Sequence, residues 1–209
     1  MQSIIWDWNG TLLNDLELCI STINTLLEKR NLKKIDSKVY KEVFSFPVKD
    51  YYRAIGFDFS REDFAVPAQE FIDLYNEGVA GCGLHTEAFD VLSYFDSIGK
   101  RQFVLSAMKQ DMLETTLKHQ KIFNFFEGVF GLDDHYAVSK IERGKQMISE
   151  FKIQNENAVI IGDTIHDFEV AQELGIACIL IANGHQSEER LQSTGVPVVT
   201  DLKELLKAI

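Results

Sequence analysis

Apolar residues at helical spacing dominate the first part of the chain after its N-terminal strand. From Asp15 to Asn31 they recur three or four positions apart, which is typical of the buried face of a helix. Further helical patterns cover residues 36–44, 48–55 and 60–76. The last pattern begins with Ser60 and Asp63 at capping-box spacing, which predicts a helix start at Ser60. No strand pattern interrupts residues 14–80, so this stretch is predicted to be a helical unit of its own.

Short apolar runs then alternate with helical patterns to the end of the chain. The predicted strands are residues 3–6, 102–105, 128–132, 158–161, 177–181 and 196–199. The predicted helices are residues 86–98, 110–119, 141–151, 167–174, 187–191 and a terminal one from 202. Strands that are apolar throughout and separated by helices indicate a parallel sheet covered on both faces. Such sheets bind ligands at the carboxyl ends of their strands.

Polar residues follow three of these predicted strands. Asp7 ends the first strand, Ser106 the second and Asp163 the fourth. A single Asp after a strand is most often a turn former or a helix cap. Three polar tips at one edge are much rarer, so the conjunction predicts a functional site.

Carboxylates so close together need a cation. Asp7 and Asp163, with Asp167 one helical turn further on, would repel one another unless a metal ion shared them. Oxygen ligands without a His or Cys cluster favour Mg²⁺ over zinc. Ser106, the backbone N–H groups after it from Ala107 onward, and a lysine could then neutralise phosphate oxygens. A carboxylate held against the phosphorus can attack it to give an aspartyl phosphate.

Composition and charge exclude some classes of binding partner. The chain has 209 residues, 45% of them hydrophobic, and a net charge of −11 without a Lys and Arg cluster, which argues against nucleic acid as a partner. No apolar run approaches the roughly 20 residues needed to cross a bilayer. The N-terminus lacks the pattern of a secretory signal, so a cytoplasmic location is expected.

The motifs resemble those of the haloacid dehalogenase superfamily, in its phosphoglycolate-phosphatase-like group with a small helical cap. They are Asp-x-x-Gly-Thr-Leu at residues 7–12, a strand followed by Ser106, and Gly-Asp-Thr-x-x-Asp at residues 162–167. The resemblance covers nearly the whole chain. It implies a Rossmann-like doubly wound parallel sheet core, formed by residues 1–12 and 85–209. An inserted all-α cap subdomain would comprise residues 13–84, with hinges at 13–15 and 81–83.

The resemblance also implies roles for individual residues. Asp7 is the expected nucleophile, and the expected Mg²⁺ ligands are Asp7, the backbone carbonyl of Asn9, Asp163 and Asp167, the last through a water or by orienting the lysine. Ser106 and Ala107 would bind the phosphate, and Thr11 would steady the loop. The phosphate-binding lysine is Lys140 or Lys145, with Lys140 favoured because it starts a helix 23 residues before Asp163.

Asn9 departs from the family pattern. Phosphatases of this family carry an Asp two residues after the nucleophile, which protonates the leaving alcohol and then deprotonates the attacking water. An amide does neither, and general acid–base catalysis contributes roughly 10² to 10⁴ in rate. Three outcomes remain open: slow turnover, another group as the acid, or phosphate binding without much turnover. Candidate substitute acids are Asp15, His85 and His166, whereas His119, His135 and His185 show no pattern that favours a role.

Two functions fit the sequence. The first is a Mg²⁺-dependent phosphatase that acts on a small phosphorylated metabolite through phospho-Asp7, as a monomer or homodimer and without nucleic-acid or membrane partners. The second is a non-catalytic phosphate-binding or regulatory protein on the same fold, with Asn9 as its signature. The aromatic-rich cap would select the substrate, but the sequence does not name that substrate.

Overall fold

A parallel β-sheet forms the centre of the computed structural model, which describes residues 1–132 and 139–209. His135 lies outside the described residues. Within them the sheet has six strands in the order β3-β2-β1-β4-β5-β6. The strands are β1 (Ser3–Trp6), β2 (Arg101–Lys109), β3 (Gly128–Leu132), β4 (Ala158–Gly162), β5 (Ala177–Ile181) and β6 (Val198–Val199). The order steps outward from β1 in both directions, as in a doubly wound sheet.

Helices cover both faces of the sheet because side chains alternate along each strand. Ile4 and Trp6 of β1 pack into one cluster, whereas Ile5 packs into the other. Helices α5 (Ala88–Ser97), α6 (Gln110–His119) and α10 (Leu205–Ala208) contribute to the first cluster. Helices α7 (Lys140–Phe151), α8 (Ile165–Leu174) and α9 (Glu188–Gln192) contribute to the second. Short 3₁₀ turns occupy η1 (Val79–Gly81), η2 (Phe123–Phe125), η3 (Asn155–Asn157) and η4 (Leu202–Glu204).

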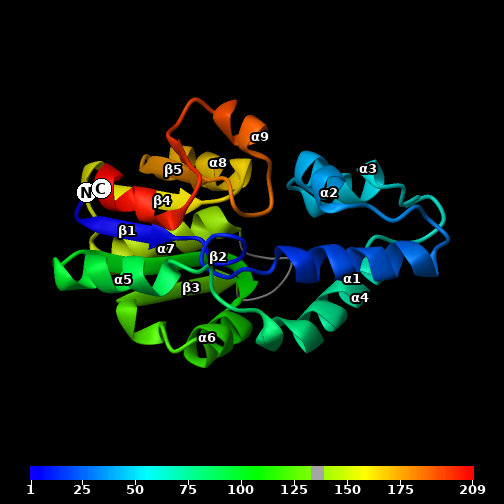
Figure 1. Ribbon diagram of the computed structural model, residues 1–209, viewed down its shortest axis with the longest axis horizontal. Helices are drawn as coiled ribbons and strands as arrows, with labels where there is room; N and C mark the ends of the chain where they lie inside the picture. The colour runs from blue at the N-terminus through cyan, green and yellow to red at the C-terminus, as the bar shows by residue number, and fades with distance from the viewer. Residues whose placement is uncertain (133–138) are drawn as a thin grey trace.

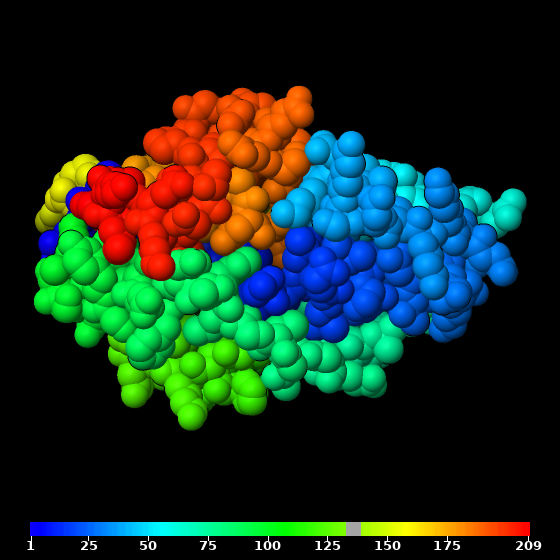
Figure 2. Space-filling view, in the orientation of Figure 1, coloured from blue at the N-terminus to red at the C-terminus, as the bar shows by residue number. Residues whose placement is uncertain are grey.

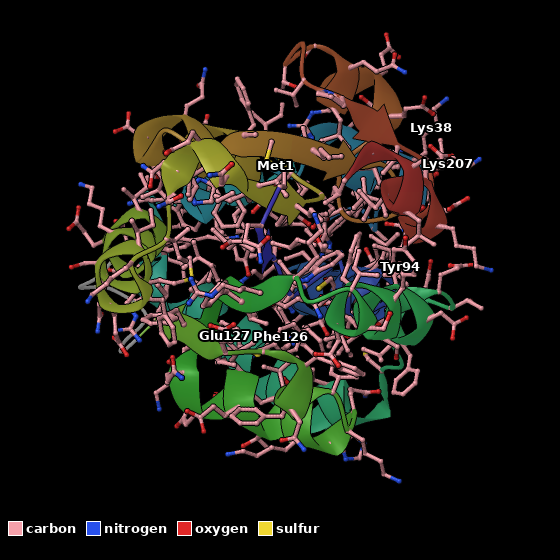
Figure 3. The ribbon with its side chains drawn as sticks, turned by 90° about the vertical axis from the view of Figure 1, so that its left-hand side faces the viewer. Met1, Lys38, Tyr94, Phe126, Glu127 and Lys207 are labelled. Carbon is pink, nitrogen blue, oxygen red and sulfur yellow. The ribbon has the colours of Figure 1, made fainter. Side chains whose placement is uncertain are left out.

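The predicted helical unit is inserted between β1 and α5. It contains α1 (Leu16–Lys29), α2 (Ser37–Val43), α3 (Val48–Ala54) and α4 (Ala65–Gly78). Figure 1 shows that this unit and the two chain termini lie at opposite ends of the sheet. Figure 3 views the molecule from the end that carries Met1 and Lys207. The predicted fold class is confirmed: a Rossmann-like α/β core with an inserted all-α cap.

The predicted start of a helix at Ser60 was wrong. Helix α4 begins at Ala65, five residues after Ser60. Asp58 accepts hydrogen bonds from both the backbone N–H and the hydroxyl of Ser60, so Ser60 closes a turn instead of capping a helix. Asp63 accepts from the N–H of Ala65, which begins the helix at that point.

Two passages of chain connect the cap to the core, and they lie side by side. Leu13 and Leu84 form an antiparallel bridge, and the N–H of Asn14 donates to the carbonyl of Gly83 at 2.9 Å. The N–H of His85 donates to the carbonyl of Leu12 at 2.9 Å. Both connections therefore cross from the core to the cap at one narrow place. None of the described helices is long and apolar enough to span a membrane.

Candidate active site

Three acidic side chains meet at the carboxyl edge of the sheet. Parallel register places Trp6 beside both Val104 and Ile161, so the residues that follow β1 and β4 are neighbours. Asp7, Asp163 and Asp167 each offer a carboxylate oxygen within 4.8 Å of the other two, and all three are buried. The structure thus brings together the three predicted carboxylates.

Lys140 lies between two of these carboxylates. Its Nζ donates to Asp7 Oδ1 at 2.7 Å and to Asp167 Oδ1 at 2.6 Å, and its side chain is only 4% exposed. Ser139 caps α7 directly before it, which points the start of this helix at the site. Lys145 is exposed and pairs with Glu142 on the same helix at 2.8 Å. Of the two candidate lysines, only Lys140 touches the acidic cluster.

The cluster carries more negative charge than Lys140 can neutralise. Burial raises the pKa of Asp7 to about 8, against the opposing effect of Lys140, and raises that of Asp163 to about 6. Burial has the same tendency at Asp167, but Lys140 outweighs it and lowers the pKa of that carboxyl. Three carboxylates with one ammonium leave an all-oxygen donor set whose ionised form needs a further cation. This donor set fits Mg²⁺.

Asp163 is held from two sides. Its Oδ1 accepts from the hydroxyl of Thr11 at 2.8 Å, and its Oδ2 accepts from the N–H of His185 at 2.6 Å. Gly10 lies against Asp163 and His185 with a φ of +73°, and a Cβ there would collide with the Asp163 carboxylate and the His185 ring. Only glycine therefore allows the loop after β1 to pass this close to Asp163.

Asp167 has a structural partner as well as Lys140. Its Oδ2 accepts from the N–H and the hydroxyl of Thr164, at 3.0 and 2.7 Å, in a capping box that starts α8. This leaves Oδ1 for Lys140. The capping box therefore fixes the carboxylate that orients the lysine.

The predicted end of the second strand at residue 105 was wrong: β2 continues to Lys109, so Ser106 and Ala107 lie within the strand and not after it. Ser106 is fully buried, and its hydroxyl oxygen accepts from the N–H of Met108 at 3.1 Å. The register of β2 with β3 shifts between Leu105 and Lys109, directly around these residues. At such an irregularity a strand leaves the regular ladder with its neighbour.

The side chain of Asn9 faces the cap. Its Nδ2 donates to Asp15 Oδ2 at 2.8 Å and to the Tyr75 hydroxyl oxygen at 2.7 Å. Despite burial, the contacts of Asp15 with His185, Asn9 and Tyr75 lower the pKa of its carboxyl to about 2. These contacts favour the ionised form of Asp15, which argues against this carboxyl as a substitute acid.

The two histidines considered as substitute acids, His85 and His166, each contact a neighbouring group. His85 Nε2 donates to the carbonyl of Gly10 at 3.0 Å, and burial lowers the pKa of this imidazole, so it supports the loop as a neutral ring. His166 stacks on Phe46 of the cap with ring centroids 4.6 Å apart. Neither contact points to proton delivery.

His185, Tyr75 and Tyr40 are the residues at this site that sequence reasoning missed. His185 Nε2 lies 3.2 Å from Asp15 Oδ1, and its Nδ1 lies 3.1 Å from the Tyr40 hydroxyl. The contacts of His185 with Asp15 outweigh its burial and raise its pKa to about 9. Tyr40 and Asp15 lie 145 and 170 residues from His185 along the chain, so no local spacing could reveal these contacts.

Comparison with known proteins identifies the family. The model of the family described as haloacid dehalogenase-like hydrolase matches residues 4–181. The chain belongs to this family. Its curated relatives include tyrosine-protein kinase PtkA of Mycobacterium tuberculosis, 23% identical over 95% of this chain and 68% of the relative. A 5'-nucleotidase of Pseudomonas aeruginosa is 23% identical over 91% of this chain and 87% of its own length.

Solved structures share the fold of this haloacid dehalogenase-like hydrolase along its full length. A family member from Streptococcus pneumoniae superposes with a TM-score of 0.86 at 20% identity, covering 100% of this chain and 98% of the other. A predicted phosphoglycolate phosphatase from Haemophilus somnus superposes with a TM-score of 0.79 at 16% identity, covering 100% and 97%. At these identities the likeness establishes the fold.

Proposed function

We propose that this haloacid dehalogenase-like hydrolase is a Mg²⁺-dependent phosphatase that hydrolyses a small phosphorylated metabolite through a phospho-Asp7 intermediate. The observation that carries the proposal is the buried cluster of Asp7, Asp163 and Asp167 with the Lys140 ammonium bridging two of the three carboxylates. The family match and the phosphatases among the structural neighbours support it.

Asp7, Asp163 and the backbone carbonyl of Asn9 would hold the metal ion, with Asp167 acting through water. When bound, Mg²⁺ draws electron density from a phosphate oxygen and so stabilises the charge that develops during transfer. Thr11 and the N–H of His185 keep Asp163 in place for this role.

Asp7 attacks in the first step. Lys140 occupies Asp7 Oδ1, so we assign Oδ2 as the atom that forms a bond to phosphorus while the bond from phosphorus to the leaving oxygen breaks. Lys140, Ser106 and the N–H of Ala107 would hold the equatorial phosphate oxygens. Water then cleaves the acyl phosphate, which releases inorganic phosphate and restores the Asp7 carboxylate.

This mechanism lacks an acid at position 9 for proton transfer. The leaving oxygen needs a proton, and the Asn9 amide supplies none. We therefore propose slow turnover of alkyl phosphates and faster turnover of aryl phosphates, whose leaving groups depart with little protonation. The second candidate, a phosphate-binding protein without turnover, is favoured by the same residue.

Residues 13–84 would move as a cap on the paired hinge strands, open for substrate and close to exclude water. The protein would work in the cytoplasm as a monomer or homodimer. Its charge of −11 disfavours nucleic acid as a partner.

Hydrolysis of an aryl phosphate tests the proposed function. We expect turnover with Mg²⁺, loss of turnover in EDTA, and loss in Asp7→Asn at unchanged folding. Undiminished hydrolysis in EDTA would refute the magnesium mechanism, and phosphate binding without turnover in the native protein would establish the second candidate.

A further inference from the structure

The carboxylate of Asp15 is the centre of a buried polar cluster that the proposed mechanism does not use. The side chain is fully buried at the start of α1, on the cap side of the hinge. It accepts hydrogen bonds from the N–H of Gly10, the amide of Asn9, the hydroxyl of Tyr75, the imidazole of His185 and the thiol of Cys19. Two of these donors belong to the loop that carries the nucleophile.

The two oxygens of Asp15 have different partners. Oδ1 accepts from Gly10 N at 2.9 Å and lies 3.2 Å from His185 Nε2. Oδ2 accepts from Asn9 Nδ2 at 2.8 Å and from the Tyr75 hydroxyl at 2.7 Å. Asn9 also donates to the Tyr75 oxygen at 2.7 Å, which closes a triangle of three side chains.

This triangle requires an amide at position 9 while position 15 is a carboxylate. An Asp at position 9 would place two carboxylates at hydrogen-bond distance in a buried site, with the single hydroxyl hydrogen of Tyr75 as the donor that both contact. The opposite arrangement would keep one donor and one acceptor between positions 9 and 15. An Asn at position 15 could keep its Oδ1 as acceptor for Gly10 and turn its Nδ2 toward a carboxylate at position 9.

We propose that Asn9 and Asp15 form an exchanged pair, that is, a donor and an acceptor whose two side chains could trade places. In this pair Asp15 is a positioning residue that fixes the nucleophile loop through Asn9 and Gly10. Tyr75 ties the pair to α4, so this support of the loop depends on the docked cap. This inference rests on the proposed phosphatase activity for its catalytic consequence. The pairing itself rests on the hydrogen bonds alone.

A swap of the two side chains tests the pair. We would compare Asn9→Asp, Asp15→Asn and the double variant Asn9→Asp/Asp15→Asn. Each single variant should lower the melting temperature by several degrees. Asp15→Asn should also lower kcat for an aryl phosphate about 10-fold or more, with a smaller change in KM. The double variant should recover most of both losses, because donor and acceptor face each other again.

Asn14→Asp is the matched control. It makes the same chemical change on an exposed residue beside Asp15, and we expect a kcat within about twofold of the native protein. Additive losses in the double variant would overturn the exchanged pair. Recovery of the melting temperature without recovery of kcat would overturn the positioning role. If the native protein hydrolyses no phosphate, the proposed function fails, and recovery of the melting temperature alone then decides whether the pair exists.

Discussion

Lys140 has the most distinctive environment of any single residue at the site. It is a buried ammonium between Asp7 and Asp167, whereas Lys145 on the same helix is exposed and bound to Glu142. Removing one partner from a buried pair leaves an uncompensated charge, which typically costs about 3 to 5 kcal/mol. The two lysines therefore make a matched pair for mutagenesis.

We predict that Lys140→Met lowers kcat/KM for an aryl phosphate at least about 100-fold, since it removes both the phosphate contact and the orientation of Asp7. Lys145→Met should change it by less than about twofold. Steady-state kinetics with both variants, alongside melting curves to confirm folding, check the prediction. An equal loss in both variants would be incompatible with the assignment of Lys140.

The sequence was informative about residues at strand tips and uninformative about residues that reach the site from elsewhere. Asp7, Asp163 and Asp167 follow apolar strands, so the topology alone predicts that they meet. Nothing near His185 or Tyr75 in the sequence marks them, because their role depends on how a loop and a cap helix pack against Asp15. Asn9 was recognised as a departure, but its partner was not.

At the scale of elements, polar contacts to α2 contribute to the docking of the cap. Arg190 of α9 donates to the carbonyls of Lys41 and Phe44, both at 2.8 Å, and Gln186 donates to that of Phe44 at 2.9 Å. These contacts satisfy carbonyls at the C-terminal end of α2, which have no partner within the helix. Figure 2 shows the cap packed against the segment around α9.

We predict that Arg190→Met loosens this docking. It should raise KM more than it lowers kcat, because the cap closes over bound substrate less readily. Amides of α2 should exchange with solvent faster, as measured by hydrogen exchange and mass spectrometry. Arg61→Met, at an exposed ion pair within the cap, is the control. Unchanged exchange in α2 would show that Arg190 does not hold the cap.

The start of α4 shows why local signals mislead. Ser60 and Asp63 have capping-box spacing, yet the helix begins at Ala65. Asp58 competes for Ser60, and Pro67 lies in the first turn, where its missing N–H costs nothing. The strands of the core were easier to predict, because a continuous apolar run between helices has few other interpretations in a soluble domain.

At the scale of the whole molecule, the proposed Mg²⁺ site would couple metal binding to stability. A ligand that binds only the folded state, at a free concentration of about 100 times its dissociation constant, stabilises that state by about 2.7 kcal/mol. For a protein of this size that corresponds to a rise of about 5 to 10 °C in melting temperature. We predict such a rise with Mg²⁺ in the native protein and little or none in Asp163→Asn, measured by scanning calorimetry. A similar rise in both proteins would place the metal elsewhere.

The central claim is that phosphorus becomes bonded to Asp7. Because Asn9 cannot deprotonate the attacking water, phospho-Asp7 should persist long enough to be trapped. The direct measurement is an acid quench during turnover of an aryl phosphate with Mg²⁺, followed by peptide mapping by mass spectrometry. We predict a phosphoryl group on Asp7 in the native protein, absent in EDTA and in Asp7→Asn. Turnover with the phosphoryl group on another residue, or with none on the protein at any quench time, would contradict the account.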